Sequence, residues 1–370
     1  MRGKNAIAIS GSHGKTTTTS LVGTLLEYSN FDPTIINGGI INAYSKNNRF
    51  GFGKWIVVEA DESDGSFLKL PHEINIVTNI DNEHLDYYKT NKRLLDSFKN
   101  FITNIPFYGY SIICIDNKNL NKLSKKIKTR KIISYAYKNK KADVRIIKIK
   151  QIDSKTIFSI LIKKNVIPKY SGIYKFKSNL LGEHNVLNAT AAIISAILVG
   201  IKIKDIQKTL NNFKGVNRRF TFLGKIKKSF IYDDYAHHPT EIKASYEIAK
   251  YLSKKNIIVV FQPHRFSRTK DLYDDFIKVL RKIDILYICD IYPAGEKSIK
   301  NINSIQLVKD IKQKNSKVYY LNKNEDINKI LSLYYNDKNL IVFMGAGSIT
   351  HEAHKLIKKN NVWKNSRNFK

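Results

Sequence analysis

Apolar and polar positions alternate in blocks along most of the chain, with short apolar runs separated by longer stretches of helical periodicity. In the first half, five apolar runs predict strands, at 6–10, 55–59, 74–79, 111–115 and 131–135. Three other stretches predict helices, from Gly14 to about Tyr28, from Asn91 to about Asn104 and from His184 to about Val199. Because strands that alternate with helices form βαβ units, we expect an α/β fold built on a parallel sheet.

Two changes of pattern divide the chain. From Asp143 to Lys177 the alternation has period two, which predicts a small antiparallel sheet appended to the parallel one. After Phe213 the strand–helix alternation resumes, with a helix beginning at Pro239 and apolar runs at 230–235, 256–262, 284–290, 317–321 and 340–345. We therefore interpret the segment GVNRRF (215–220) as the junction between two α/β domains, 1–217 and 218–370.

The net charge of +33 raises the question of nucleic-acid binding. The charge comes mostly from Lys residues spread through every segment, with no Arg-rich stripe, so we favour attraction to anionic nucleotide substrates and keep specific nucleic-acid binding as the alternative. Cys114 and Cys289 lie in apolar runs and are expected to be buried thiols of a cytoplasmic protein. The stretch from Ala189 to Ile201 is shorter than the about 20 residues that a membrane span needs, so we expect no membrane association.

The sharpest local signal is a glycine-containing turn between the first predicted strand and the first predicted helix. Its residues are Gly11, Ser12, His13, Gly14, Lys15, Thr16 and Thr17. Such a turn lets backbone N–H groups approach phosphate oxygens, and the helix N-terminus adds its dipole. Lys15 is placed to reach the β- and γ-phosphates and Thr16 to bind Mg²⁺. The loop is two residues shorter than the general P-loop, which has a glycine where this chain has Ile9.

Two acidic clusters follow predicted strands. Glu59, Asp61, Glu62 and Asp64 follow one strand, and the next strand ends in a segment with Asn79, Asp81, Glu83, His84 and Asp86. The carboxyl ends of parallel strands lie where such sheets bind ligands. Oxygen ligands with one imidazole suit Mg²⁺, or Mn²⁺, better than Zn²⁺. The sequence therefore predicts a divalent-cation site here, with a solvated acidic loop as the alternative.

Nine motifs occur in order: GSHGKTTTT, EADESDGSFL, TNIDNEHLDYY, LGEHNVLNATAA, GVNRRF, DDYAHHPTEI, QPHRFSRTKDLYDDF, DIYPAGE and GAGSI. In this combination the chain resembles the ATP-dependent Mur ligase family from about Asn5 to about Ile349. The resemblance implies a central P-loop ATP-binding domain, here 1–217, and a C-terminal Rossmann-like domain, here 218–370. The family also has an N-terminal domain that holds a UDP moiety. Since the P-loop strand begins near residue 5, we expect that domain to be absent from this sequence.

The resemblance also implies an activity. The segments EADESD, TNIDNEHLDYY and DDYAHHPTE favour the branch that joins L-alanine to the carboxylate of UDP-N-acetylmuramate in peptidoglycan precursor synthesis. In the implied reaction the carboxylate attacks the γ-phosphate of ATP, and the amino group of L-alanine then displaces phosphate from the acyl phosphate. Three alternatives stay open: a nucleotide-binding fragment that is inactive without a separate N-terminal UDP-binding polypeptide, the ligase that recycles a whole tripeptide, and a nucleic-acid-associated ATPase.

Roles for individual residues come from the same resemblance. Lys15 would hold the β- and γ-phosphates, Thr16 the first Mg²⁺, and Glu59 and His84 the metals near the transferred phosphoryl group. Residues His184, Asn185 and Asn188 would form the adenine site, for which helix capping and core packing is the alternative. In the second domain, Arg219 would approach the phosphates and Asp234 the ribose hydroxyls. The residues that would face the muramyl carboxylate and the incoming alanine are Tyr235, His237, His264, Arg265 and Arg268.

Overall fold

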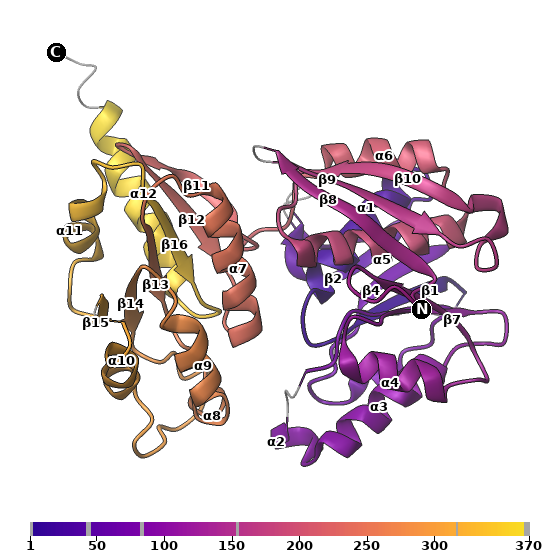
Figure 1. The fold of residues 1–370 in the computed structure, drawn as a ribbon, viewed down its shortest axis with the longest axis horizontal. Coiled ribbons are helices and arrows are strands. Elements are labelled where there is room, and N and C mark those ends of the chain that lie inside the picture. Colours follow the sequence, from indigo (N-terminus) through magenta and orange to yellow (C-terminus); the bar gives the residue numbers. More distant parts are fainter. Residues whose placement is uncertain (1–2, 42–45, 82–84, 153–154, 316, 366–370) are drawn as a thin grey trace. The chain divides into compact units, whose positions relative to one another are not determined.

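The computed structural model describes residues 3–41, 46–81, 85–152, 155–315 and 317–365. The chain divides into two compact units, Met1–Asn217 (unit 1) and Arg218–Lys370 (unit 2). Figure 1 shows each unit as a sheet covered by helices. Among the described residues, no helix combines the length and the apolar character needed to cross a membrane.

Unit 1 is built on one ten-stranded sheet with the order β10-β9-β8-β7-β6-β5-β1-β4-β2-β3. From β2 to β8 every neighbouring pair is parallel, whereas β3, β9 and β10 pair antiparallel. The strands are β1 (Asn5–Ser10), β2 (Thr34–Ile41), β3 (Lys46–Arg49), β4 (Trp55–Glu59), β5 (Ile74–Val77), β6 (Tyr110–Cys114), β7 (Lys131–Ala136), β8 (Val144–Ile152), β9 (Lys155–Ile162) and β10 (Gly172–Ser178).

Helices cover both faces of this sheet, which is why the inner parallel strands are apolar almost throughout (Figure 1). One group consists of α1 (Lys15–Tyr28), α5 (Glu183–Val199) and α6 (Ile203–Asn212), and the other of α2 (Leu85–Tyr88), α3 (Asn91–Thr103) and α4 (Lys118–Lys126). Two short 3-10 helices, η1 (Ser66–Lys69) and η2 (Pro168–Tyr170), complete the unit. Local capping fixes the helix starts: the side chain of Thr90 accepts from the N–H of Arg93 at the start of α3.

Unit 2 contains a six-stranded sheet with the order β11-β12-β16-β13-β14-β15, parallel except for the β11–β12 pair. Its strands are β11 (Thr221–Ile226), β12 (Ser229–Asp234), β13 (Ile257–Phe261), β14 (Ile285–Cys289), β15 (Val318–Leu321) and β16 (Leu340–Met344). Its helices are α7 (Pro239–Leu252), α8 (Phe266–Asp271), α9 (Tyr273–Leu280), α10 (Ser304–Lys312), α11 (Ile327–Leu331), η3 (Ser332–Tyr334) and α12 (Ile349–Asn365).

Strand β16 shows how the second sheet is buried. Its Leu340, Val342 and Met344 belong to one buried cluster and its Ile341 and Phe343 to another. The first cluster includes residues of α7, α9 and α10, and the second includes residues of α11 and α12. Because successive side chains of a strand point to opposite faces, an unbroken apolar run here reflects helices on both sides.

The predicted α/β fold class is confirmed, including the P-loop sheet, the antiparallel addition and the second sheet. The apolar runs became β1, β4, β5, β6 and β7 in unit 1, and the period-two stretch became β8, β9 and β10. Strand β2 was not predicted, since the glycine pair in its sequence TIINGGII interrupts the apolar pattern. Cys114 and Cys289 are both buried free thiols, as expected.

Candidate functional site

The predicted phosphate loop lies between β1 and α1. Gly14, directly before α1, has φ +84°, and Gly11 has φ +130°, both in the region that favours glycine. A Cβ atom at Gly11 would lie 2.3 Å from Thr78 Oγ1 and 2.9 Å from the main-chain oxygen of Asn79. The backbone therefore approaches the end of β5 too closely for any side chain at Gly11.

The residues after β5 hold this loop in place. The side chain of Asn79 accepts from the N–H of His13 at 2.8 Å and donates to the His13 carbonyl at 2.9 Å. The Asp81 N–H donates to Ser12 Oγ at 2.9 Å, and its carboxylate lies 3.1 Å from His13 Nε2. Asn79 and Asp81 were considered as cation ligands from the sequence, but in the structure both contact the phosphate loop.

Lys15 forms a buried ion pair with Glu62. Its Nζ lies 2.8 and 2.9 Å from the two carboxylate oxygens of Glu62 and 2.8 Å from the carbonyl oxygen of Gly11. The side chains of Lys15 and Glu62 are 15% and 1% exposed. Burial acts to lower the pKa of Lys15, but the charge of Glu62 and the hydrogen bonds to it raise the pKa by more. The lysine that the sequence assigns to phosphates is thus kept charged by Glu62, which the sequence placed in the predicted cation site and which contacts Lys15 in the structure.

Thr16 and Glu59 converge beside the loop. Thr16 Oγ1 donates to Glu59 Oε1 at 3.0 Å, and the N–H of Gly38 donates to Glu59 Oε2 at 2.7 Å. Within the described ranges, no group of three or more His, Cys, Asp and Glu side chains is arranged to hold a metal. His84, the other predicted metal-binding residue, lies outside the described residues.

The candidate adenine residues lie on the first turns of α5. Asn185 donates to the Leu181 carbonyl at 2.8 Å, and Asn188 donates to Asn185 Oδ1 at 3.4 Å. A Cβ at Gly14 would lie 2.5 Å from Asn188 Oδ1, so α5 lies directly against the phosphate loop. His184 is also on this first turn. Their role toward adenine stays a prediction.

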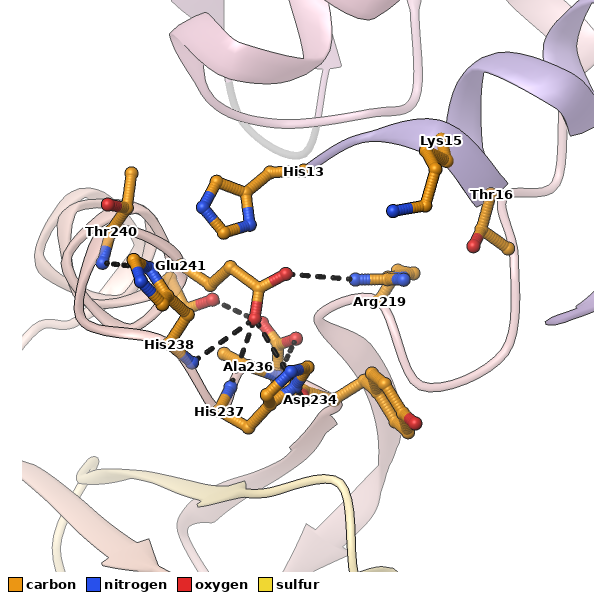
Figure 2. A network of polar contacts seen from close by, with 12 residues as sticks. His13, Lys15, Thr16, Arg219, Asp234, Ala236, His237, His238, Thr240 and Glu241 are labelled. Carbon is orange, nitrogen blue, oxygen red and sulfur yellow. Dashed lines mark hydrogen bonds and ion pairs between the residues drawn. The ribbon is translucent and has the colours of Figure 1, made fainter. Parts of the chain in front are cut away.

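In unit 2, the end of β12 and the start of α7 form a polar network around Glu241 (Figure 2). The Glu241 carboxylate accepts from the N–H groups of His237 and His238 at 3.1 and 3.3 Å, and lies 3.8 Å from Arg219 Nη1. Asp234 is 5% exposed, and its oxygens accept from Ser245 Oγ and from the N–H of Ala236. The predicted ribose residue therefore already has two internal donors.

The hydrogen bonds assign different tautomers to His237 and His264. His237 Nδ1 lies 2.9 Å from the Tyr235 carbonyl, which can only accept, so Nδ1 carries the proton and Nε2 the lone pair. Arg268 Nη1 donates to His264 Nδ1 at 3.2 Å, so the proton of His264 is on Nε2. The centroids of the two imidazole rings lie 5.8 Å apart. The unit thus presents one imidazole acceptor and one imidazole donor close together.

Tyr292, for which no role was predicted, supports the second of these rings. Its ring stacks on that of His264 with centroids 5.5 Å apart and an interplanar angle of 11°. The Tyr292 carbonyl accepts from the N–H of Arg265, a residue with φ +70°. Glu296 of the same loop accepts from the N–H and hydroxyl of Ser267 at 3.0 and 2.6 Å. The DIYPAGE motif therefore positions His264, Arg265 and the start of α8.

Comparison with known proteins decides the family. The Mur ligase middle domain matches residues 9–196, and the Mur ligase glutamate ligase domain matches residues 218–347. The chain belongs to the Mur ligase family. The resemblance inferred from the nine motifs is therefore confirmed.

Two relatives and one solved structure show which Mur ligases this chain is similar to. A UDP-N-acetylmuramate–L-alanine ligase of Agrobacterium fabrum is 46% identical over 360 residues, covering 96% of this chain and 76% of that protein. The same-named enzyme of Bartonella henselae is 42% identical, covering 100% of this chain and 78% of its own length. A crystal structure of a UDP-N-acetylmuramate–alanine ligase of Thermotoga maritima has the same fold, with a TM-score of 0.79, 24% identity, and coverage of 97% and 76%.

Mur ligases depend on ATP, and one solved structure similar to this chain, a MurF ligase of Thermotoga maritima, is a complex with ADP. It covers 97% of this chain and 80% of its own, with a TM-score of 0.75 at 18% identity. In the present chain, the predicted phosphate-loop residues and Glu59 lie together in unit 1. The candidates Arg219, Asp234, His237, His264, Arg265 and Arg268 all belong to unit 2.

The lowered pKa values of His237 and His264 predict how the stability of unit 2 falls at acid pH. Burial, with a contribution from the charge of Arg268, lowers the pKa of His237 to about 3 and that of His264 to about 4. Since both values lie below the ordinary 6.5, the contribution of these residues to stability is complete above pH 6.5 and is lost as the pH falls through 4 and then 3. Burial raises the pKa of Asp234 to about 6, which acts in the opposite direction.

We expect the variant H237Q/H264Q to show a shallower fall of the unfolding midpoint between pH 6.5 and pH 4 than the wild type. Thermal unfolding followed by circular dichroism across this range measures the effect. His351→Gln, on the exposed side of α12, is the matched control and should keep the wild-type slope. An unchanged slope in the double variant would show that these imidazoles are not held neutral by the fold.

Proposed function

We propose that the chain catalyses the ATP-dependent joining of L-alanine to the carboxylate of UDP-N-acetylmuramate, a step of peptidoglycan precursor synthesis. The observation that carries this proposal is the 46% identity to a UDP-N-acetylmuramate–L-alanine ligase along 96% of the chain. The phosphate loop described above supports the ATP-dependent half of the reaction, and the paired imidazoles and arginines of unit 2 support the acid- and amine-binding half.

The reaction divides into two displacements. A carboxylate oxygen of the muramyl group attacks the γ-phosphorus of ATP, the bond from that phosphorus to the bridging oxygen breaks, and ADP leaves. The amine nitrogen of L-alanine then attacks the carbonyl carbon of the acyl phosphate, the bond from this carbon to the phosphate oxygen breaks, and the departing phosphate takes up the proton that the nitrogen loses. Catalysis of such steps depends mainly on positioning and on neutralising charge.

In unit 1, the main-chain N–H groups of Gly14–Thr17 at the N-terminus of α1 provide the phosphate site. Lys15 carries the positive charge that the transferred phosphoryl group requires. The phosphates of ATP would compete with Glu62 for the positive charge of Lys15. Until ATP binds, Glu62 keeps Lys15 protonated and holds it in place. Asn188, packed against Gly14, and its neighbours Asn185 and His184 are the residues that we assign to adenine.

A Mg²⁺ ion, with Mn²⁺ as the substitute, fits the oxygens of Thr16 and Glu59. Their separation of 3.0 Å is close to the about 2.9 Å between adjacent ligands of an octahedral Mg²⁺ whose bonds are 2.0–2.1 Å long. Bound there, the ion would neutralise charge on the phosphates of ATP. We assign His84 to the same site from its motif alone.

In unit 2, Arg268 and Arg265 would bind the muramyl carboxylate, because guanidinium groups match a carboxylate geometrically. His264 donates from Nε2, and Arg219 would stabilise phosphate charge. The Nε2 atom of His237 accepts a hydrogen bond from the amine of L-alanine and orients its lone pair. Since burial lowers the pKa of His237 to about 3, this imidazole orients the amine and does not retain its proton.

Phosphate release by the purified chain with Mg-ATP tests the proposal, with UDP-N-acetylmuramate and L-alanine added singly and together. We expect release only when both are present, together with one equivalent of the alanylated nucleotide by mass spectrometry. Faster release with the tripeptide than with L-alanine would favour the recycling reaction instead. Release that ignores both additions would refute the ligase assignment.

A second assay concerns the UDP-binding domain found in the family. We propose that full activity needs the N-terminal UDP-binding domain that the family resemblance implies, on the same polypeptide or a separate one; the chain covers 76% of the Agrobacterium relative. The assay is repeated with that domain of the relative added in trans. Activity that appears only on this addition would support the partner, whereas equal activity without it would exclude the need for one.

A further inference from the structure

The segment Asn37–Gly39 is the middle of strand β2 and lies against the first turns of α1. Strand β2 pairs with β4 in parallel from Thr34 to Ile36, and this pairing stops at the Ile36–Val58 position. The residues that follow on each strand are Asn37 and Glu59, the last residue of β4, and β2 continues to Ile41 with a register shift in its pairing to β3. A glycine pair at this position is not required by the backbone, because neither Gly38 nor Gly39 has a positive φ.

Asn37 anchors the segment onto α1. Its side-chain amide is buried and donates to Ser20 Oγ at 2.8 Å and to the Gly39 carbonyl at 3.0 Å. Ser20 Oγ in turn donates to the carbonyl of Thr16 at 2.8 Å. The segment is therefore tied to the first two turns of the helix whose N-terminus binds phosphate. Its position relative to Thr16 is fixed by three consecutive hydrogen bonds.

The glycines lie against the two side chains that we assign to Mg²⁺. The N–H of Gly38 holds Glu59 Oε2 at 2.7 Å, leaving Oε1 directed at Thr16. A Cβ at Gly38 would lie 2.9 Å from both carboxylate oxygens of Glu59. A Cβ at Gly39 would lie 2.7 Å from Thr16 Cγ2. One added methyl group at either position would therefore displace one of the two oxygen donors.

We infer that Gly38 and Gly39 are positioning residues of the divalent-cation site, Gly38 orienting Glu59 through its main-chain N–H and both glycines leaving room for the donor side chains. This inference rests on the cation site of the proposed function. Groups that orient metal ligands change metal affinity by about 10–100-fold when altered. Gly38→Ala should therefore weaken the effect of Mg²⁺ on ATP binding without removing any side chain that contacts ATP.

Calorimetric titration of the full chain with ATP, in Mg²⁺ and in EDTA, tests this inference without muramate, alanine or turnover. In the wild type we expect tighter binding with Mg²⁺. Gly38→Ala should lose about 10–100-fold of this gain, with affinity in EDTA and the melting temperature kept near wild type. Gly39→Ala should act in the same direction through Thr16. Ile36→Ala, on the exposed side of β2, is the control and should keep the full gain.

A compensating variant separates positioning from general damage. Glu59→Asp shortens the carboxylate, so in G38A/E59D the added methyl group has room and part of the Mg²⁺ effect should return relative to Gly38→Ala. Three results would overturn the inference: a full Mg²⁺ gain in Gly38→Ala, an equal loss of affinity with and without Mg²⁺, or no Mg²⁺ gain in the wild type. None of them bears on the alanylated product, so the ligase assignment is judged separately by the product assay.

Discussion

Lys15→Met is expected to abolish ligation and also to destabilise unit 1 by about 3–5 kcal/mol, because it removes the cation that neutralises the buried Glu62 carboxylate. Glu62 is 1% exposed, and both of its oxygens contact Lys15 within 2.9 Å. Phosphate release measures the first effect and urea denaturation the second. A phosphate-binding lysine on an exposed loop would show only the loss of activity.

The double variant K15M/E62Q makes this prediction specific. Removing both charges of a buried pair is often neutral for stability, so we expect stability to return while activity stays absent. Lys138→Met is the matched control within the same unit, since Lys138 pairs with Glu183 at 2.9 Å but is 73% exposed. It should cost less than about 1 kcal/mol. A double variant no more stable than Lys15→Met would contradict the account of this pair.

Arg268→Ala is expected to lower kcat/KM for UDP-N-acetylmuramate by about 10²–10³-fold, the usual effect of losing one donor to developing charge. Arg268 contributes a guanidinium group and also sets the tautomer of His264 through its bond to Nδ1. Arg268→Lys keeps the charge but loses the planar fork, so it should restore activity only in part. ATP affinity, which depends on unit 1, should stay near wild type in both variants.

Lys270→Ala controls for the loss of a positive charge on the same helix, because Lys270 is exposed on α8. Steady-state kinetics with each substrate varied in turn measure all three variants. We expect Lys270→Ala to behave as wild type. An Arg268→Ala enzyme with unchanged kcat/KM for the muramyl substrate would remove this arginine from the site.

The sequence predicted the features that depend on local pattern. The phosphate loop was identified because a strand, two glycines, Lys15, Thr16 and a helix are consecutive in the chain. The contacts of Glu62 and Asn79 with the phosphate loop were not predicted, because they depend on which strands are neighbours, and from the sequence both residues were considered for the cation site. In the sheet, β1 lies between β5 and β4, so side chains from both adjoining strand ends reach the loop.

The same distinction applies to unit 2. The motif QPHRFSRTK suggested that His264, Arg265 and Arg268 act together, and in the structure Arg268, on α8, contacts His264, which precedes that helix. Tyr292 comes from the end of another strand, and no periodicity links it to His264. No role was predicted from the sequence for the glycine pair of β2, because its position beside Thr16 and Glu59 appears only in the three-dimensional structure.

The central claim is that this chain couples ATP cleavage to amide formation through an acyl phosphate. Its most direct test uses UDP-N-acetylmuramate labelled with ¹⁸O in the carboxylate, with ATP, Mg²⁺ and L-alanine, and the UDP-binding domain added where activity requires it. The account predicts that each amide bond formed transfers one ¹⁸O atom to the released phosphate. Alanylated product accompanied by unlabelled phosphate, or phosphate released with no product, would contradict it.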